Sequence, residues 1–182
     1  MATKEPKELE RFIRWFVVPY KKLKEIPDGD GAFLALSMGL FLCERYYKAE
    51  AKIQDEEGTS KDDQFRNKAA KDLNVNSTFF GHFWQVYRNG MQHQATPKTY
   101  KIDGITYKWS FDADYEAHPM YFDKDGYRII CLNPWKFADF MIQKILAKPS
   151  CLKKSIVYEL GKIRENDPAY KPKRVVFSQK YP

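Results

Sequence analysis

Cysteine is scarce in this sequence, and no apolar segment in it is long. The 182 residues include three scattered cysteines, Cys43, Cys131 and Cys151, and no Cys-x-x-Cys pair. This spacing disfavours a zinc knuckle, a redox pair and a disulfide framework, so we expect a reduced, cytoplasmic setting. The longest apolar run, 32–43, is shorter than the about 18 residues of a membrane-spanning candidate. We therefore expect no membrane partner, and the mixed charges of the first residues predict no signal peptide.

Several sequence signatures of catalysis are also missing. There is no glycine-rich phosphate loop, no Gly-x-Ser-x-Gly elbow and no His-Glu-x-x-His helix, so we expect neither a cofactor nor a metal. Four side chains that can bind cations alternate further along the chain: Asp112, Asp114, Glu116 and His118. On a strand they would share one face. That face could bind a cation, but we favour a solvated acidic edge that deters strand pairing.

What is present indicates a folded domain with basic ends. Hydrophobic residues make up 43% of the chain and aromatic residues 16%, which excludes a wholly disordered protein and predicts a core rich in rings. The net charge is +7, and residues 1–24 hold seven lysines and arginines against three glutamates, while 144–182 hold ten against three acids. A solvated basic surface is the favoured interpretation, and a nucleic acid, an acidic protein or an anionic membrane are the alternatives.

The hydrophobic periodicity predicts a mainly α-helical protein with a small β insertion. Helices are expected over about 9–16, 31–53, 60–70, 78–91, 134–147 and 152–164. Pro19 should bend or end the first of them, and Asn133 should cap the helix that starts at Pro134. Two hairpins are expected, 99–102 with 105–111 and 120–122 with 127–132. We predict one helical domain over 1–165, with the insertion at 98–132 and an extended basic tail at 166–182.

The chemistry of the chain is concentrated at Arg88, Asn89 and His93, near the end of an aromatic helix. Arg88 offers a permanent cationic fork for phosphate, His93 can transfer protons near neutral pH, and Asn89 can orient either group. Five residues along an ideal helix separate Arg88 and His93 by about 140°. We expect the helix to loosen at Gly90, before Pro97, so that His93 turns toward Arg88 of its own or a second chain.

The stretch Arg88-Asn-Gly-Met-Gln-His93 resembles the Arg-x(4–6)-His motif of the HEPN superfamily (higher eukaryotes and prokaryotes nucleotide-binding domains). The common variant of that motif begins Arg-Asn and ends in His, as here. The helical order agrees, because the motif follows a long apolar helix, and Glu44 in that helix is placed where many members carry an acidic residue that orders the motif. The resemblance covers about residues 8–148, and the β-rich stretch 98–132 departs from simple HEPN bundles.

The resemblance implies a helical bundle that forms a homodimer with both motifs at one composite cleft. Active members are metal-independent endoribonucleases, which implies RNA as substrate, catalytic roles for Arg88, Asn89 and His93, and a supporting role for Glu44. One His per chain cannot easily be both acid and base, so two chains are a physical reason for a dimer. Toxin–antitoxin or defence systems, with an inhibitory protein partner, are the implied setting.

Other interpretations stay open. His93 could cap the end of a helix, Arg88 could form a purely structural pair with Glu44, and the chain could be a catalytically inactive HEPN-like interaction or dimerisation module. The aromatic residues of 79–87 are expected in the core rather than as a base-stacking platform, and His82 is expected to be structural. A third hypothesis is that the β insertion binds a small ligand.

Overall fold

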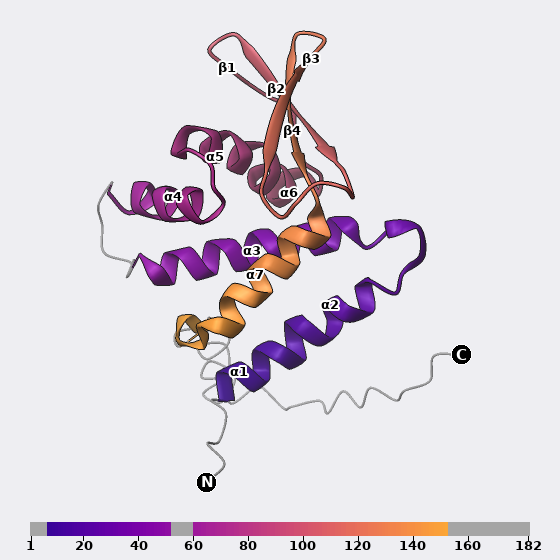
Figure 1. Ribbon diagram of the computed structural model, residues 1–182, viewed down its shortest axis with the longest axis vertical. Coiled ribbons are helices and arrows are strands. Elements are labelled where there is room, and N and C mark those ends of the chain that lie inside the picture. The colour runs from indigo at the N-terminus through magenta and orange to yellow at the C-terminus, as the bar shows by residue number, and fades with distance from the viewer. Residues whose placement is uncertain (1–6, 52–59, 153–182) are drawn as a thin grey trace, which may run out of the picture. The chain divides into compact units, whose positions relative to one another are not determined.

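The computed structural model describes residues 7–51 and 60–152, which belong to one compact unit, Met1–Leu152. Its α-helices are α1 (Lys7–Phe12), α2 (Val18–Leu23), α3 (Ala32–Glu50), α4 (Ser60–Asp72), α5 (Ser77–Phe83), α6 (Asn89–Gln94) and α7 (Pro134–Ala147). Its strands are β1 (Tyr100–Ile102), β2 (Ile105–Phe111), β3 (Met120–Lys124) and β4 (Tyr127–Leu132). Figure 1 shows their arrangement. The predicted helix over 152–164, apart from Leu152, and the predicted basic tail lie outside the described residues.

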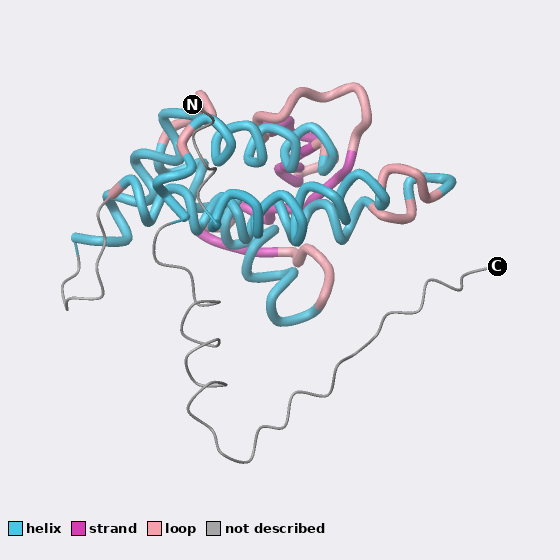
Figure 2. Tube along the Cα trace, turned by 90° about the horizontal axis from the view of Figure 1, so that it is seen from below, coloured by secondary structure: helices cyan, strands magenta, loops and turns pink. Residues whose placement is uncertain are grey.

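The two long apolar helices, α3 and α7, form the centre of the described unit. They pack against each other more extensively than any other pair of elements. Figure 1 shows α7 crossing α3, and Figure 2 shows the helices from below, packed together. Gly39 permits the close approach, because a Cβ at this position would lie 2.8 Å from the Phe137 ring. Both helices were predicted from apolar spacing, and the structure confirms them. No helix within the described ranges is long and apolar enough to cross a membrane.

The start of α7 confirms the predicted cap. The Asn133 side-chain oxygen accepts hydrogen bonds from the backbone N–H groups of Trp135 and Lys136, each at 3.0 Å. Its amide group donates to the carbonyl of Ala113 at 2.7 Å. The buried Asn133 therefore satisfies two N–H groups of the first turn and ties the helix to the loop after β2.

The first helix does not end at Pro19. A π-helical turn, η1 (Ile13–Val17), joins α1 directly to α2, and the chain stays helical to Leu23. The backbone N–H of Val18 bonds to the carbonyl of Ile13, so the wider turn comes just before the proline, which has no N–H to donate. Pro19 was expected to bend or end the helix, and the expectation that the helix ends there is wrong.

Both predicted hairpins are present, but they do not form a separate insertion. β1 pairs antiparallel with β2, and β3 pairs antiparallel with β4. A parallel pairing of β2 with β4, from Thr106 opposite Tyr127 to Phe111 opposite Leu132, joins the hairpins into one mixed sheet of order β1-β2-β4-β3. The chain between β2 and β3 must therefore pass the end of β4, so that β4 can lie between them. Two adjacent hairpin patterns in the sequence do not reveal this connection.

The sheet shares the hydrophobic core of the helices. Tyr107, Ile130 and Leu132 are buried in the same cluster as the side chains of α3, α5 and α7. Phe33 of α3 meets the Phe111 ring edge-on, with centroids 5.1 Å apart. The fold is therefore an α+β mixture, and the prediction of a mainly α-helical bundle with an appended insertion is wrong. The reason is that β4 and Tyr107 of β2 bury side chains in the helical core, although β3 is exposed along its whole length.

Candidate functional site

One helix carries the predicted motif. α5, a second π-helical turn η3 (Trp84–Arg88) and α6 follow each other without a break from residue 77 to residue 94, and we call this segment the motif helix. Its start is capped by Asn76, whose side-chain oxygen accepts from the N–H of Phe79 at 2.7 Å. The wide turn ends at Arg88, and π-turns within helices frequently occur at functional positions.

A buried tyrosine fixes the motif helix to the sheet. The Tyr87 hydroxyl lies 2.8 Å from the carbonyl oxygens of both Ser110 in β2 and Ile130 in β4. Burial raises the pKa of this hydroxyl well above its usual range, so it stays a neutral donor. Because Arg88 is the next residue, the sheet sets the position from which the Arg88 side chain leaves the helix.

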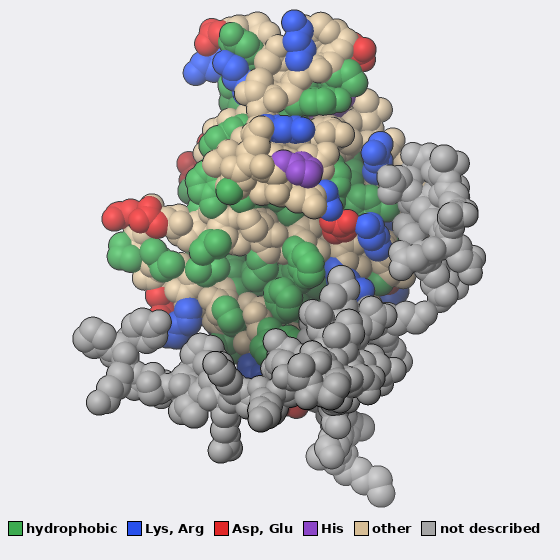
Figure 3. Space-filling model, turned by 180° about the vertical axis from the view of Figure 1, so that it is seen from behind, with side chains coloured by type: hydrophobic (Ala, Val, Ile, Leu, Met, Phe, Trp, Pro, Cys, Tyr) green, Lys and Arg blue, Asp and Glu red, His purple; other side chains and the backbone are tan. Residues whose placement is uncertain are grey.

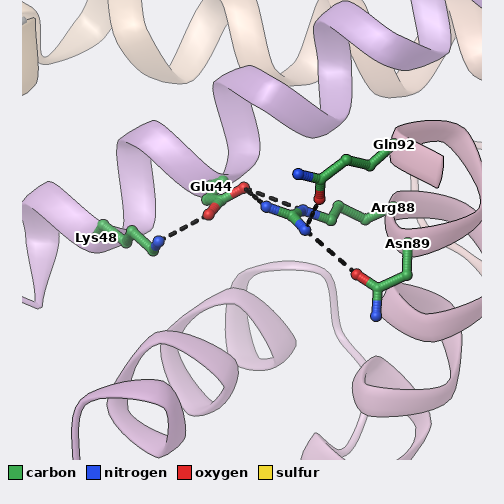
Figure 4. A network of polar contacts seen from close by, with 5 residues as sticks. All are labelled: Glu44, Lys48, Arg88, Asn89 and Gln92. Carbon is green, nitrogen blue, oxygen red and sulfur yellow. Dashed lines mark hydrogen bonds and ion pairs between the residues drawn. The ribbon is translucent and has the colours of Figure 1, made fainter. Parts of the chain in front are cut away.

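Arg88 reaches across to α3 and is held there by a carboxylate. Its Nη2 and Nε atoms both donate to Oε2 of Glu44, at 3.0 and 3.2 Å. Its Nη1 donates to the side-chain oxygens of Asn89, at 3.3 Å, and of Gln92. Figure 4 shows this network, in which the two helices face each other through the guanidinium. The side chains of Arg88 and Glu44 are 27% and 24% exposed, so the pair is partly shielded but reachable from solvent.

The carboxylate of Glu44 is kept ionised by its neighbours. Partial burial by itself raises its pKa, but hydrogen bonds and charge from Lys48 and then Arg88 outweigh the burial and lower the pKa of Glu44. Lys48 Nζ donates to Oε1 at 2.7 Å, so each carboxylate oxygen has its own cationic partner. At neutral pH the site is therefore an ordered chain of alternating charges, Lys48, Glu44 and Arg88.

His93 does not join this network. The motif helix stays α-helical from Asn89 to Gln94 and ends at Ala95, which has a left-handed φ of 58°. His93 is exposed and makes no hydrogen bond or ion pair with any residue in the described ranges. The regular helix keeps the about 140° between His93 and Arg88, so one chain does not bring them together. The alternative that His93 caps the helix end gains no support from these contacts.

The expectation that the helix loosens at Gly90 is wrong, and packing explains the glycine. A Cβ on Gly90 would lie 2.5 Å from the Lys98 nitrogen and 2.7 Å from the Thr96 oxygen. The chain after the helix turns back against Gly90, where the Lys98 N–H bonds to the Val86 carbonyl at 2.9 Å. Gly90 thus allows the segment leading into β1 to cross the motif helix closely.

Three side chains of the network were missed from sequence. Lys48, Gln85 and Gln92 each lie four residues from a network member on the same helix, and Gln85 accepts from the Asn89 amide at 2.7 Å. Side chains four apart on a helix are neighbours, so this spacing was a usable signal. The structure brings together the predicted Glu44, Arg88 and Asn89, and it leaves His93 apart.

The alternating acidic segment is a loop rather than a strand. The Asp112 carboxylate accepts from the N–H of Asp114 at 2.9 Å, and the His118 ring lies 2.8 Å from the Leu73 carbonyl. Glu116 pairs with Lys136 at 3.4 Å. The common face that a strand would have given these residues is therefore absent from this loop. Within the described ranges no cluster of His, Cys, Asp and Glu is arranged to hold a metal ion.

An apolar stripe on α3 leads directly to the network. Leu34 and Phe41 are 59% and 53% exposed and lie seven residues apart, within about 20° of each other on the helix. Glu44 and Lys48 continue the stripe toward the C-terminal end of α3. Figure 3 shows hydrophobic side chains gathered across the middle of the face opposite to that of Figure 1. We call Leu34, Phe41, Glu44 and Lys48 the α3 stripe.

Comparison with known proteins adds no family or relative. No family model, no curated protein and no solved structure matches this chain.

Proposed function

We propose that this protein is a HEPN-like, metal-independent endoribonuclease that acts as a homodimer through Arg88, Asn89 and His93. The observation that carries the proposal is the Arg88 guanidinium, which is anchored by Glu44 and Asn89 yet reachable from solvent, with the exposed His93 five residues further along the same helix. A fixed cation suits the phosphate whose charge grows during strand cleavage. We also propose a cytoplasmic setting, with which the three free cysteines agree.

Two protomers are needed because a single chain separates its acid–base group from its cation. The α3 stripe offers a surface for the second chain, since its apolar half, Leu34 and Phe41, ends beside Glu44 and Arg88. Contiguous apolar side chains on a surface mark interaction sites. A two-fold contact over this stripe repeats the same residues from both sides, so it would bring together the two networks and the two motif helices that carry His93.

In the composite cleft, His93 accepts the proton of an RNA 2′-hydroxyl while that oxygen attacks the adjacent phosphorus. The partner's His93 donates a proton to the 5′-oxygen as its bond to phosphorus breaks. Arg88 stabilises the additional negative charge on the phosphate oxygens. The products are a 2′,3′-cyclic phosphate and a 5′-hydroxyl end. Glu44 and Asn89 are positioning residues, because they act by holding Arg88.

The direct test is cleavage of mixed RNA by purified protein in excess EDTA. The wild type should cleave, Arg88→Ala should lose about 10²–10³ in rate, and His93→Ala should lose about 10²–10⁴. Gln94→Ala, an exposed neighbour on the same helix, is the matched control and should cleave as the wild type. Cleavage that EDTA abolishes, or that His93→Ala leaves unchanged, would contradict the proposal.

The dimer has its own test. Phe41→Glu places a charge in the apolar half of the α3 stripe and should give a monomer by light scattering and lose RNA cleavage. Met120→Glu changes an equally exposed side chain on β3, 51% exposed, and should remain dimeric and active. A wild type that is monomeric at assay concentrations would remove the composite cleft.

A second candidate is a non-catalytic interaction module. It is favoured by the engagement of Arg88, whose five N–H groups include four that are directed at Glu44, Asn89 and Gln92. In this case the network stiffens the surface beside the α3 stripe, and a second copy or an inhibitory protein covers it. Dimerisation lost in Phe41→Glu, together with no RNA cleavage by the wild type, would select this candidate.

A further inference from the structure

A pocket separate from the Arg88 network opens between α5 and the sheet. It has a volume of about 240 Å³ and is lined by side chains that include Asn76, Phe79, His82, Tyr107, Tyr121 and Arg128. This volume lies below the roughly 300–1,000 Å³ of sites for drug-sized ligands. The pocket therefore suits part of a nucleotide, with the rest of the ligand on the open surface, and it is too small for a folded partner.

Aromatic rings form the walls of the pocket. Tyr121 is 47% exposed, and its ring centroid lies 5.0 Å from that of Phe79 at an interplanar angle of 51°. The His82 ring stacks on Tyr107 with centroids 4.3 Å apart and an interplanar angle of 19°. An exposed ring packed against a second ring offers a surface on which any base can stack, because every base has a π-face.

The pocket also contains a cation that can change its partner. The Arg128 guanidinium lies 4.7 Å from the centroid of the Tyr121 ring and pairs with Asp123 at 2.9 Å. Arg128 donates two hydrogen bonds to the Asp123 carboxylate, at 2.9 and 3.3 Å, and the Asp123 side chain is 65% exposed. A phosphate can replace Asp123 on Arg128 and accept the same bidentate hydrogen bonds.

His82 supplies a polar group that does not add charge. Partial burial, followed by the positive charge of Arg128, lowers its pKa, and Asp103 opposes this weakly. The ring is therefore neutral at neutral pH, when it can both donate and accept a hydrogen bond. Such a group can form a hydrogen bond with a base edge or with a ribose hydroxyl.

We propose that this pocket binds one nucleotide, with the base stacked on Tyr121 and the phosphate on Arg128 in place of Asp123. The nucleotide is either a free nucleoside monophosphate or one unit of single-stranded RNA, which share this chemistry. The proposal goes beyond cleavage at Arg88 and His93 and does not depend on it. Nucleotide binding at this pocket is expected whether or not the protein is a ribonuclease.

The opposite face of the sheet provides a matched control. Tyr127 precedes Arg128 on β4 and so faces away from the pocket, and Lys108 Nζ lies 3.3 Å from the centroid of its ring. Like Tyr121 with Arg128, this pair places a cation near a tyrosine ring. Lys108 and Tyr127 do not line the pocket, so substituting either of them should not affect nucleotide binding.

The test is a titration of the full-length His93→Ala protein in EDTA, which removes cleavage from the measurement. CMP, AMP and a short single-stranded RNA should bind saturably, and Arg128→Met and Tyr121→Ala should each weaken binding roughly tenfold. Lys108→Met and Tyr127→Ala should stay within about twofold of the parent. If Arg128→Met and Tyr121→Ala weaken the binding of CMP and AMP, the site is assigned to mononucleotides. If they weaken only the binding of the RNA, the site is assigned to a strand.

A second readout checks the placement of the phosphate. Nuclear magnetic resonance of the His82 ring should show its pKa rising when CMP binds, because the phosphate offsets the charge of Arg128. Equal binding of CMP and ribose 5-phosphate would overturn the proposal, since it would remove the base. So would Arg128→Met and Tyr121→Ala proteins, folded by circular dichroism, that bind CMP as the parent does.

Discussion

The ion pair between Glu44 and Arg88 gives a quantitative test of the network. The perturbation is a double-mutant cycle with Glu44→Gln, Arg88→Met and the double variant. Exposed pairs contribute about 0.2–1 kcal/mol, whereas breaking a buried pair costs about 3–5 kcal/mol. The two side chains are about one quarter exposed and share two hydrogen bonds through one carboxylate oxygen. We therefore expect each single variant to lose about 1.5–2.5 kcal/mol of unfolding free energy, with a coupling of about 1–2 kcal/mol.

Urea unfolding at fixed protein concentration measures the cycle, since a dimer's stability depends on concentration. Lys48→Met is the matched control: Lys48 is 46% exposed, and its loss should cost less than about 1 kcal/mol. The pKa of Glu44 is lowered in the folded state. The stabilisation is therefore complete above the ordinary carboxyl pKa and is lost as the pH falls through the lowered value. A coupling below about 0.3 kcal/mol at neutral pH would refute the reasoning.

Three further predictions concern the support of the site. Tyr87→Phe removes the hydroxyl shared by two strand carbonyls and should lower the unfolding free energy by about 1–3 kcal/mol, measured in urea, whereas a change below about 0.5 kcal/mol would contradict that role. Gly90→Ala should cost about 1–3 kcal/mol in the same assay and alter the amide resonances of Thr96 and Lys98, and an Ala variant as stable as the wild type would refute the close crossing. Because the pKa of His82 is lowered on folding, the wild type should lose stability relative to His82→Gln as the pH falls below about 6.5; thermal unfolding from pH 7.5 to 5 measures this, and parallel curves would be inconsistent with it.

Local signals in the sequence predicted the separate elements well. Asn133 before Pro134 marked the start of α7, and the Asp-Gly turns marked both hairpins. These features are decided by residues close in sequence, so periodicity and turn chemistry are sufficient. The parallel pairing of β2 with β4 is different, because it depends on how two hairpins meet over the core. No local sequence pattern indicates this parallel pairing, and the fold class was therefore predicted wrongly.

The candidate site was predicted in composition but only partly in geometry. Glu44 and Arg88 are 44 residues apart, and the structure places them in contact. The path of the helix after Arg88 depends on the chain that returns over Gly90. A glycine within a helix favours loosening when it is considered alone, but here it allows close packing. This contact between distant backbone segments is the information that the sequence pattern did not contain.

The central claim is that two protomers build one cleavage site, and mixing protomers tests it most directly. Wild-type protein is co-refolded with increasing amounts of His93→Ala protein, and RNA cleavage in EDTA is measured at constant total protein. If one cleft needs His93 from both chains, an equal mixture keeps about one quarter of the wild-type rate, because activity follows the square of the wild-type fraction. A linear decrease, with about one half of the rate remaining, would contradict the composite site.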